Sequence, residues 1–173
     1  MFEAFQTAIF DSVAEQLRDR FPHKSLSIVV PSALIYEDLE LLRKTGRIKW
    51  DPFLKTQPFF ELDNVHPIRL VVYYRGNPVG YAFGGYRKSH SAVEICWMEK
   101  RNDAHEDLDH QMLGIALDAY SAYAIFLRAQ EHKVDKIALV NPIEGVRRYY
   151  QDSNFKYVDS YNGAVSAMIL TSN

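Results

Sequence analysis

Six consecutive residues combine types and spacing that suit the binding of an anion: Gln111-Met112-Leu113-Gly114-Ile115-Ala116. They stand between a predicted strand and a long predicted helix. A glycine in the first turn of a helix lets a ligand approach the backbone, and the small Ala116 keeps that approach clear. The free N–H groups of this turn and the positive end of the helix dipole favour a diphosphate. The alternative is that Gly114 only allows the helix to pack closely on the sheet.

A second candidate for chemistry is Glu94, a carboxylate among apolar neighbours in the predicted strand Ala92–Glu99. Partial burial of a carboxyl group favours proton uptake, which suits a general base. Strand alternation predicts two faces, one with Glu94, Cys96 and Met98 and the other with Val93, Ile95 and Trp97. The alternative is a structural glutamate at the rim of the sheet, paired with Arg87 or Lys88 across the hairpin.

The pattern Gln/Arg-x-x-Gly-x-Gly/Ala between a strand and a helix resembles the acetyl-CoA-binding motif of the GNAT N-acetyltransferases. This sequence has Gln111-x-x-Gly114-x-Ala116 in that place. The resemblance covers residues 68–170, whereas residues 1–67 are divergent. It implies one α/β domain over residues 1–173, with a mixed, mostly antiparallel central sheet flanked by helices and an extra N-terminal helix.

The resemblance further implies transfer of an acetyl group from acetyl-CoA, a co-substrate, to an amine, with no metal. Glu94 takes the place of the catalytic glutamate of the histone-type members, and Tyr150 that of the proton donor to the departing thiolate. Tyr149 takes this place if the helix register shifts by one, and the alternative for Tyr150 is a packed helix tyrosine. The implied cofactor-binding residues are Trp97, Met98, Gln111, Met112, Leu113, Gly114, Ile115, Ala116 and Asn141.

Two further positions follow the family pattern after the next predicted strand. Asn141 ends that strand, where its amide would hold the pantetheine arm; the alternative is a helix cap or a turn before Pro142. Asn154 precedes Phe155 where the family has glycine, a mild departure because Asn tolerates the left-handed conformation.

The loop before Gln111 is several residues longer than is usual in the family. From Glu99 to His110 it holds five acidic and two basic side chains, a net charge of −3. Acidic groups repel a diphosphate, although exposed charges farther away than about 10 Å are screened. The loop therefore favours weaker binding of the cofactor. His105 and His110 in this loop are five residues apart, a spacing that does not place two metal ligands on one helical face.

Periodicity predicts the elements that must position these residues. An amphipathic helix runs through Phe2, Phe5, Ile9, Val13 and Leu17 and ends before Pro22. After a strand at 26–30, Ser32 caps a helix that ends near Gly46, and residues 50–67 form a structured loop or broken helix. The remaining predictions are strands at 68–75, 79–87, 92–99 and 136–140, helices at 114–131 and 144–152, a turn at 76–78, and a hairpin at 155–170 turning at Asn162-Gly163.

Composition sets the outer limits on function. The 173 residues include 47% hydrophobic and 24% charged side chains, which is typical of a globular domain. A net charge of −2 gives no field towards nucleic acid or an anionic membrane. The single Cys96 excludes an internal disulfide, and a small core residue is its predicted role. No apolar run approaches a membrane span and the start lacks the basic residues of a secretory signal, so we expect a cytoplasmic protein.

These features predict an N-acetyltransferase that acts on an amine of an unidentified small molecule or protein. One alternative is a catalytically silent acyl-CoA-binding or protein-interaction module on the same fold, which the acidic loop favours. Another is a small-ligand domain of unrelated α/β fold, in which the Gly114 pattern is a coincidence. The N-terminal helix either caps the sheet or pairs subunits of a homodimer.

Overall fold

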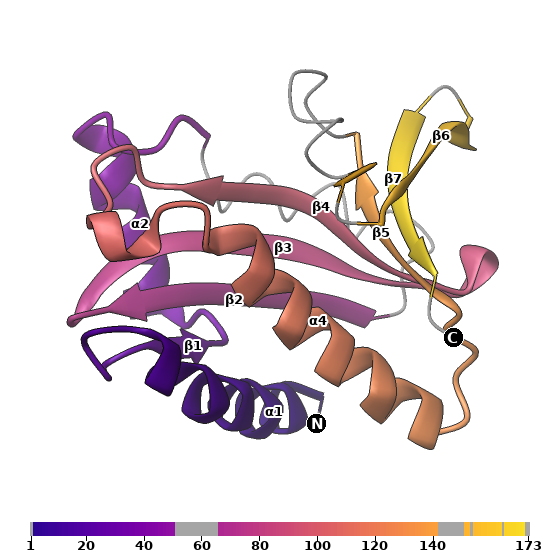
Figure 1. The fold of residues 1–173 in the computed structure, drawn as a ribbon, viewed down its shortest axis with the longest axis horizontal. Coiled ribbons are helices and arrows are strands. Elements are labelled where there is room, and N and C mark those ends of the chain that lie inside the picture. The colour runs from indigo at the N-terminus through magenta and orange to yellow at the C-terminus, as the bar shows by residue number, and fades with distance from the viewer. Residues whose placement is uncertain (1, 51–65, 142–150, 153, 164, 172–173) are drawn as a thin grey trace.

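The computed structural model describes residues 2–50, 66–141, 151–152, 154–163 and 165–171, and its strands form one sheet (Figure 1). In spatial order the seven described strands are β1-β2-β3-β4-β5-β7-β6. The strand bounds are β1 Ser27–Val29, β2 His66–Tyr74, β3 Asn77–Arg87, β4 Ala92–Lys100, β5 Lys136–Val140, β6 Lys156–Asn162 and β7 Val165–Thr171. The helices are α1 Phe2–Leu17, α2 Ala33–Lys44 and α4 Met112–Ala129, with 3₁₀ turns η1 Arg18–Arg20, η2 Lys88–His90 and η3 Glu106–Leu108.

Neighbouring strands of the sheet pair antiparallel, except β4 and β5, which run parallel. The long connection through α4 makes this parallel pairing possible, because parallel neighbours need a crossover rather than a tight turn. The mixed, mostly antiparallel α/β sheet predicted from the sequence is therefore confirmed.

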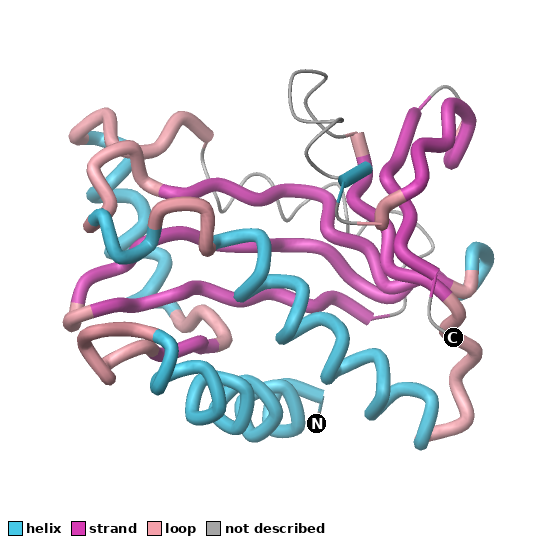
Figure 2. The backbone as a smooth tube through the Cα atoms, viewed as in Figure 1, coloured by secondary structure: helices cyan, strands magenta, loops and turns pink. Residues whose placement is uncertain are grey.

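Helices cover both faces of the sheet, α1 and α4 on one face and α2 on the other (Figure 2). Alternation along β2 follows this arrangement, since Ile68 and Val72 pack with α1 and α4 while Val71 packs with α2. The Tyr120 hydroxyl, in the middle of α4, shares its one proton between the backbone oxygens of Ile68 at 2.7 Å and Ala82 at 3.1 Å. These bonds fix α4 across β2 and β3.

The helix α4 is, contrary to the sequence-based expectation, long and apolar enough to cross a membrane by length and composition alone. Its packing accounts for this composition, because eight of its residues are buried in the core between the helix and the sheet. A helix that is apolar on most sides is typical of the interior of a domain.

The buried stripe of α1 differs from the predicted one. Phe2 and Phe5 are 39% and 46% exposed, whereas Gln6 and Phe10 are buried. Phe5 stacks on the ring of Phe126 in α4, with centroids 4.9 Å apart, so its ring is covered only in part. The Gln6 amide instead donates a hydrogen bond to the backbone oxygen of Pro67 at 2.8 Å.

Cap and turn residues explain why most of the remaining elements agree with the sequence-based prediction and why one turn differs from it. Ser32 caps α2 as predicted, its hydroxyl accepting a hydrogen bond from the Ile35 N–H at 3.4 Å. The β6–β7 hairpin turns at Asn162-Gly163, also as predicted. The β2–β3 turn, however, is formed by Arg75 and Gly76, both with positive φ, so β3 begins at Asn77. The predicted loop at 50–67 and helix at 144–152 lie almost wholly outside the described residues.

Candidate functional site

The strands β4 and β5 run side by side for four residues and then separate. Their pairing begins at Ala92 with Lys136 and ends at Ile95 with Leu139, after which β4 continues to Lys100 while β5 stays with β7 (Figure 1). Main-chain N–H and C=O groups beyond this point no longer bond across the two strands. Among the described residues, a ligand that enters between β4 and β5 would meet these groups in place of the neighbouring strand.

A β-bulge in β4 lies at the point where β4 and β5 separate. On the β3 side, Gly84 pairs with Ile95 and Phe83 with Trp97, so Cys96 is the extra residue. A Cβ atom on Gly84 would lie 1.8 Å from the backbone oxygen of Glu94, which shows why only glycine fits opposite the bulge.

The bulge also corrects the predicted faces of β4. Because it adds one residue, the alternation reverses beyond Cys96: Ile95 and Met98 both pack on the α4 side, and Trp97 packs on the α2 side. The prediction that Met98 shares a face with Glu94, and Trp97 with Ile95, is therefore wrong. A strict two-residue alternation cannot predict a bulge that adds one residue to a strand.

The first turn of α4 is open to solvent at Gly114. A Cβ atom at this position would meet nothing within 4 Å, so the alternative role of Gly114 in close helix packing does not hold. The preceding residue, Gln111, makes no side-chain cap bond to the helix. The N–H groups of the first turn are thus bordered by open space, as the predicted diphosphate seat requires. Met112, Ile115 and Ala116 are buried, so only their backbone can contribute to this seat.

The acidic loop before α4 is largely compensated within the protein. The Asp103 carboxylate pairs with Arg101 at 2.6 Å and with Arg47 at 2.9 Å, and the hydrogen bond from Arg101 lowers the pKa of Asp103. Asp107 accepts a hydrogen bond from the Tyr74 hydroxyl at 2.7 Å. Glu99, a third acid of the loop, accepts a hydrogen bond from the backbone N–H of Lys49 at 2.6 Å. Three of the five acids therefore hold the loop in place.

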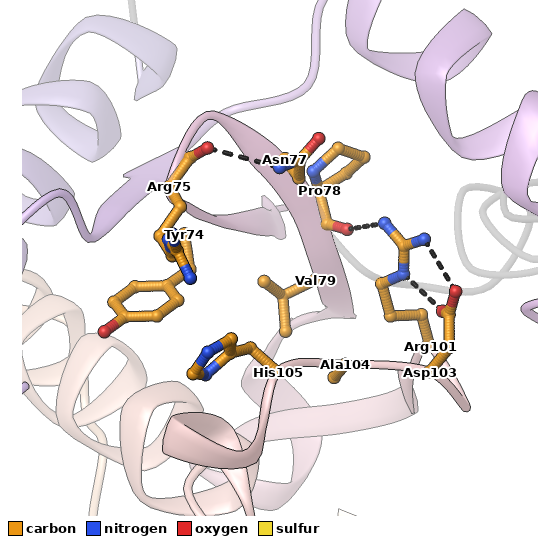
Figure 3. A pocket seen from close by; sticks show the side chains of 9 residues that line it. All are labelled: Tyr74, Arg75, Asn77, Pro78, Val79, Arg101, Asp103, Ala104 and His105. Carbon is orange, nitrogen blue, oxygen red and sulfur yellow. Dashed lines mark hydrogen bonds and ion pairs between the residues drawn. The ribbon is translucent and has the colours of Figure 1, made fainter. Parts of the chain in front are cut away.

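A polar hollow of about 430 Å³ lies where this loop begins (Figure 3). It is lined by the β2–β3 turn and by residues 101–105. The Arg101 guanidinium on its wall donates to Asp103 and, at 3.1 Å, to the backbone oxygen of Pro78 (Figure 3). None of its lining residues in the described part of the chain comes from β5, so the hollow is separate from the opening between β4 and β5.

Glu94 is fully buried and has strong partners. The Arg87 Nε atom lies 3.0 Å from Oε1 and 2.9 Å from Oε2 of Glu94, and the Tyr161 hydroxyl donates to Oε2 at 2.6 Å. The pairing with Arg87 is the structural alternative drawn from the sequence, although it lies in the interior rather than at a rim. Whether Glu94 also serves as a base stays a prediction.

Other candidate residues lie around the same point of the sheet. Burial and the neighbouring Glu94 raise the pKa of the Cys96 thiol, which keeps it protonated and supports a packing role. Trp97 lies edge-to-face with Trp50, the ring centroids 5.8 Å apart. Asn141 is exposed beyond the end of β5 in a left-handed conformation, and its N–H donates to the backbone oxygen of Ser166 at 2.8 Å. Tyr149 and Tyr150 lie outside the described residues.

Sequence reasoning missed Tyr161 as a member of this cluster. The residue is in β6, where the pairing with β7 shifts between Val158 and Asn162. The shift moves Tyr161 out of the regular ladder and towards Glu94. The Asn-Gly turn that follows was a usable signal for the hairpin, but no local pattern reveals which strand the tyrosine reaches.

Comparisons with known proteins support the fold. No protein-family model matches the sequence, and no curated protein matches it either. The crystal structure of an acetyltransferase from Thermus thermophilus has a TM-score of 0.55 at 14% identity, covering 86% of this chain and 97% of that one. A PaiA N-acetyltransferase from Thermoplasma acidophilum, in complex with coenzyme A, gives 0.51 at 13% identity, covering 86% and 99%. The GNAT domain of S. lividans PAT gives 0.55 at 11% identity, covering 85% and 90%. The chain therefore has the fold of the GNAT acetyltransferases.

Proposed function

We propose that this protein transfers an acetyl group from acetyl-CoA to the amino group of an acceptor. The observation that carries the proposal is the juxtaposition of two openings. One is the separation of β4 from β5 after Ile95, and the other is the open first turn of α4 at Gly114. A diphosphate at the helix N-terminus would leave the rest of the cofactor to extend between the strands. The coenzyme A complex of a protein with the same fold supports this choice of ligand.

The proposed reaction is a direct attack of the amine nitrogen on the thioester carbonyl. A C–N bond forms, the C–S bond breaks, and the thiolate of coenzyme A leaves. An amine is mostly protonated at neutral pH, so the reaction needs a proton acceptor, and the thiolate needs a proton. Glu94 is the proposed base and Tyr150 the proposed donor. The β4 backbone at Trp97 and Met98, the segment 111–116 and Asn141 are the proposed contacts of the cofactor.

A silent acyl-CoA-binding module is the second candidate, and one observation favours it. The Glu94 carboxylate is fully buried and already bonded to Arg87 and Tyr161. A group enclosed in this way cannot contact an amine directly. Activity therefore depends on whether a proton can reach Glu94 through one of its partners.

Substitution of Gly114 tests the cofactor seat. We expect Gly114→Val to abolish acetyl-CoA binding, because the branched side chain fills the space that the diphosphate needs, at a stability change of about 1 kcal/mol or less. Binding is measured by thermal shift, where acetyl-CoA at about 100 times its Kd stabilises a binding protein by about 2.7 kcal/mol. Ala129→Val, at the exposed end of the same helix, is the control for a β-branched residue in α4.

The outcomes distinguish the candidates. Unchanged acetyl-CoA affinity in folded Gly114→Val would contradict the seat. Binding by the wild type together with release of free coenzyme A thiol in the presence of amines supports the transferase. Binding without release of the thiol for any amine in a broad panel supports the silent module.

A further inference from the structure

The enclosed carboxylate of Glu94 has two bonded partners that are half-buried, Tyr161 and Cys96. Arg87, its ion-pair partner, has a side chain only 8% exposed, and Glu94 is not exposed at all. Tyr161 is half-buried, and its hydroxyl donates to Glu94 at 2.6 Å. Of the two half-buried groups bonded to Glu94 in the described part of the chain, Tyr161 makes the closer contact, since the Cys96 thiol lies 4.0 Å away.

The phenol of Tyr161 is held in place by a second set of contacts. Its ring packs against His90 of η2, with centroids 4.8 Å apart, and its backbone oxygen lies 3.0 Å from His90 Nε2. The Lys136 ammonium in turn donates to the backbone oxygen of His90 at 2.7 Å. These contacts join the β6 bulge, η2 and the start of β5, so the hydroxyl has a defined position over Glu94.

The titratable and charged groups around the pair come from two strands and from η2, whose His90 packs on Tyr161. Arg87 of β3 and Cys96 of β4 face Glu94, and the Cys96 thiol lies 4.0 Å from Oε1. Burial and then the nearby Glu94 raise the pKa of Tyr161, and that of Cys96 is raised in the same way. Both groups therefore stay protonated at neutral pH, and each can donate a hydrogen bond to the Glu94 carboxylate.

The position of Glu94 and Tyr161 in the sheet favours an acceptor that approaches from one face of the sheet. Glu94 precedes Ile95, the last residue of β4 that pairs with β5. Ile95 packs on the α4 side, so Glu94 and Tyr161 lie on the opposite face. Glu94 and Tyr161 therefore lie on the face that α1 and α4 do not cover, and an acceptor that approaches the separation of the strands from this face would meet Tyr161 before Glu94 (Figure 2).

We propose that Tyr161 is a catalytic residue that passes a proton from the acceptor amine to the buried carboxylate of Glu94. This inference rests on the proposed acetyl transfer. As the amine nitrogen attacks the thioester carbon, its proton moves to the Tyr161 oxygen, and the Tyr161 hydroxyl proton moves to Oε2 of Glu94. The C–S bond breaks and the thiolate takes a proton from its proposed donor, Tyr150, which regains one from water. Glu94 later releases its proton to solvent by the same path, so charge and protons balance.

The test compares Tyr161→Phe with Glu94→Gln at saturating acetyl-CoA. We expect each variant to lower kcat by about 10²–10⁴, the usual contribution of a positioned proton acceptor, with the Kd for acetyl-CoA within about twofold of wild type. The double variant should be no slower than the slower single variant, because both residues act in one step. Tyr157→Phe removes a hydroxyl from the same strand and is the matched control, with an unchanged kcat.

The pH profile separates a relay from a structural hydrogen bond. The relay predicts that both variants change the acid side of the kcat/KM profile in the same way, because the proton passes through both residues in one step. If Tyr161 only stabilises the fold, Tyr161→Phe keeps the acid limb and a kcat close to that of the wild type, which overturns the inference. If the wild type binds acetyl-CoA but acetylates no amine, the proposed function fails as well. Activity in the wild type with an unaffected Tyr161→Phe overturns the inference alone.

Discussion

The two halves of β4 belong to one strand but have opposite surroundings. From Ala92 to Ile95 the strand pairs on both sides, and its one charged residue, Glu94, is fully buried between Arg87 and Tyr161. From Trp97 to Lys100 it pairs, among the described strands, with β3 alone, and its residues are partly exposed. The bulge at Cys96 separates the closed half from the open half.

This difference shows how the protein combines a ligand opening with a buried charge. The open half offers main-chain groups, whose bonding capacity does not depend on side-chain type. The closed half needs complete pairing of its polar side chains, because an isolated buried charge is strongly unfavourable. The proposed proton transfer therefore depends on Tyr161, which is bonded to the closed half but is itself only half-buried.

Removal of the Arg87 guanidinium should have the largest effect on the closed half. We expect Arg87→Met to destabilise the protein by about 3–5 kcal/mol, because it leaves the Glu94 carboxylate buried without its cation. Chemical denaturation measures the loss. The more exposed pair of Arg43 and Glu40 is the matched control, and Arg43→Met should cost less than about 1 kcal/mol.

A rescue experiment completes this test. The double variant Arg87→Met/Glu94→Leu replaces the ion pair with apolar side chains, so much of the lost stability should return. An exposed ion pair contributes less than about 1 kcal/mol to stability. If Arg87→Met lost no more stability than that, the two halves of β4 would differ less than their burial indicates.

A second enclosed polar group, His66 at the start of β2, should make stability depend on pH. His66 is buried and hydrogen-bonded to the Tyr123 hydroxyl, and desolvation, followed by the charge of His132, lowers its pKa from 6.5 to about 4. The unfolded chain therefore binds more protons than the folded one between these two pH values. Stability is fully present above this window and falls by up to about 3 kcal/mol as the pH drops through it.

Denaturation at neutral pH and at a pH near the lowered pKa measures the contribution of His66. The variant His66→Gln keeps a side chain that can bond Tyr123 but cannot titrate in this range. It should lose less stability between the two conditions than the wild type does. An equal loss in both proteins would assign the acid sensitivity to other groups.

Substitutions of Gly84, opposite the bulge, and of Gly114, in the first turn of α4, should change stability the least and in opposite directions. Gly84→Ala should destabilise the protein by about 1–3 kcal/mol, because its Cβ atom would lie 1.8 Å from the backbone oxygen of Glu94. Gly114→Ala should stabilise it by up to about 1 kcal/mol, since its Cβ meets nothing within 4 Å and alanine favours the helix. Thermal unfolding of the two variants measures both signs. Equal effects at the two positions would contradict the difference between a packed and an open glycine.

The sequence by itself determined the fold class and the location of the candidate cofactor seat. Both depend on local signals, such as the apolar period of α4, the Ser32 cap and the Asn162-Gly163 turn, which act within a few residues. The glycine pattern at Gly114 is of the same kind, because a helix start requires only its own backbone. Long periodic segments and turn residues carry enough information to be predicted without knowing their neighbours.

Only the tertiary structure decided which side chains meet at the centre of the sheet. The bulge at Cys96 shifts the faces of β4 by one residue, and the bulge in β6 moves Tyr161 onto Glu94 from 67 positions away in the chain. Likewise, the partners of the acidic loop, Arg47 and Tyr74, come from distant elements. Such contacts depend on strand register and packing across the sheet, and a local pattern contains neither.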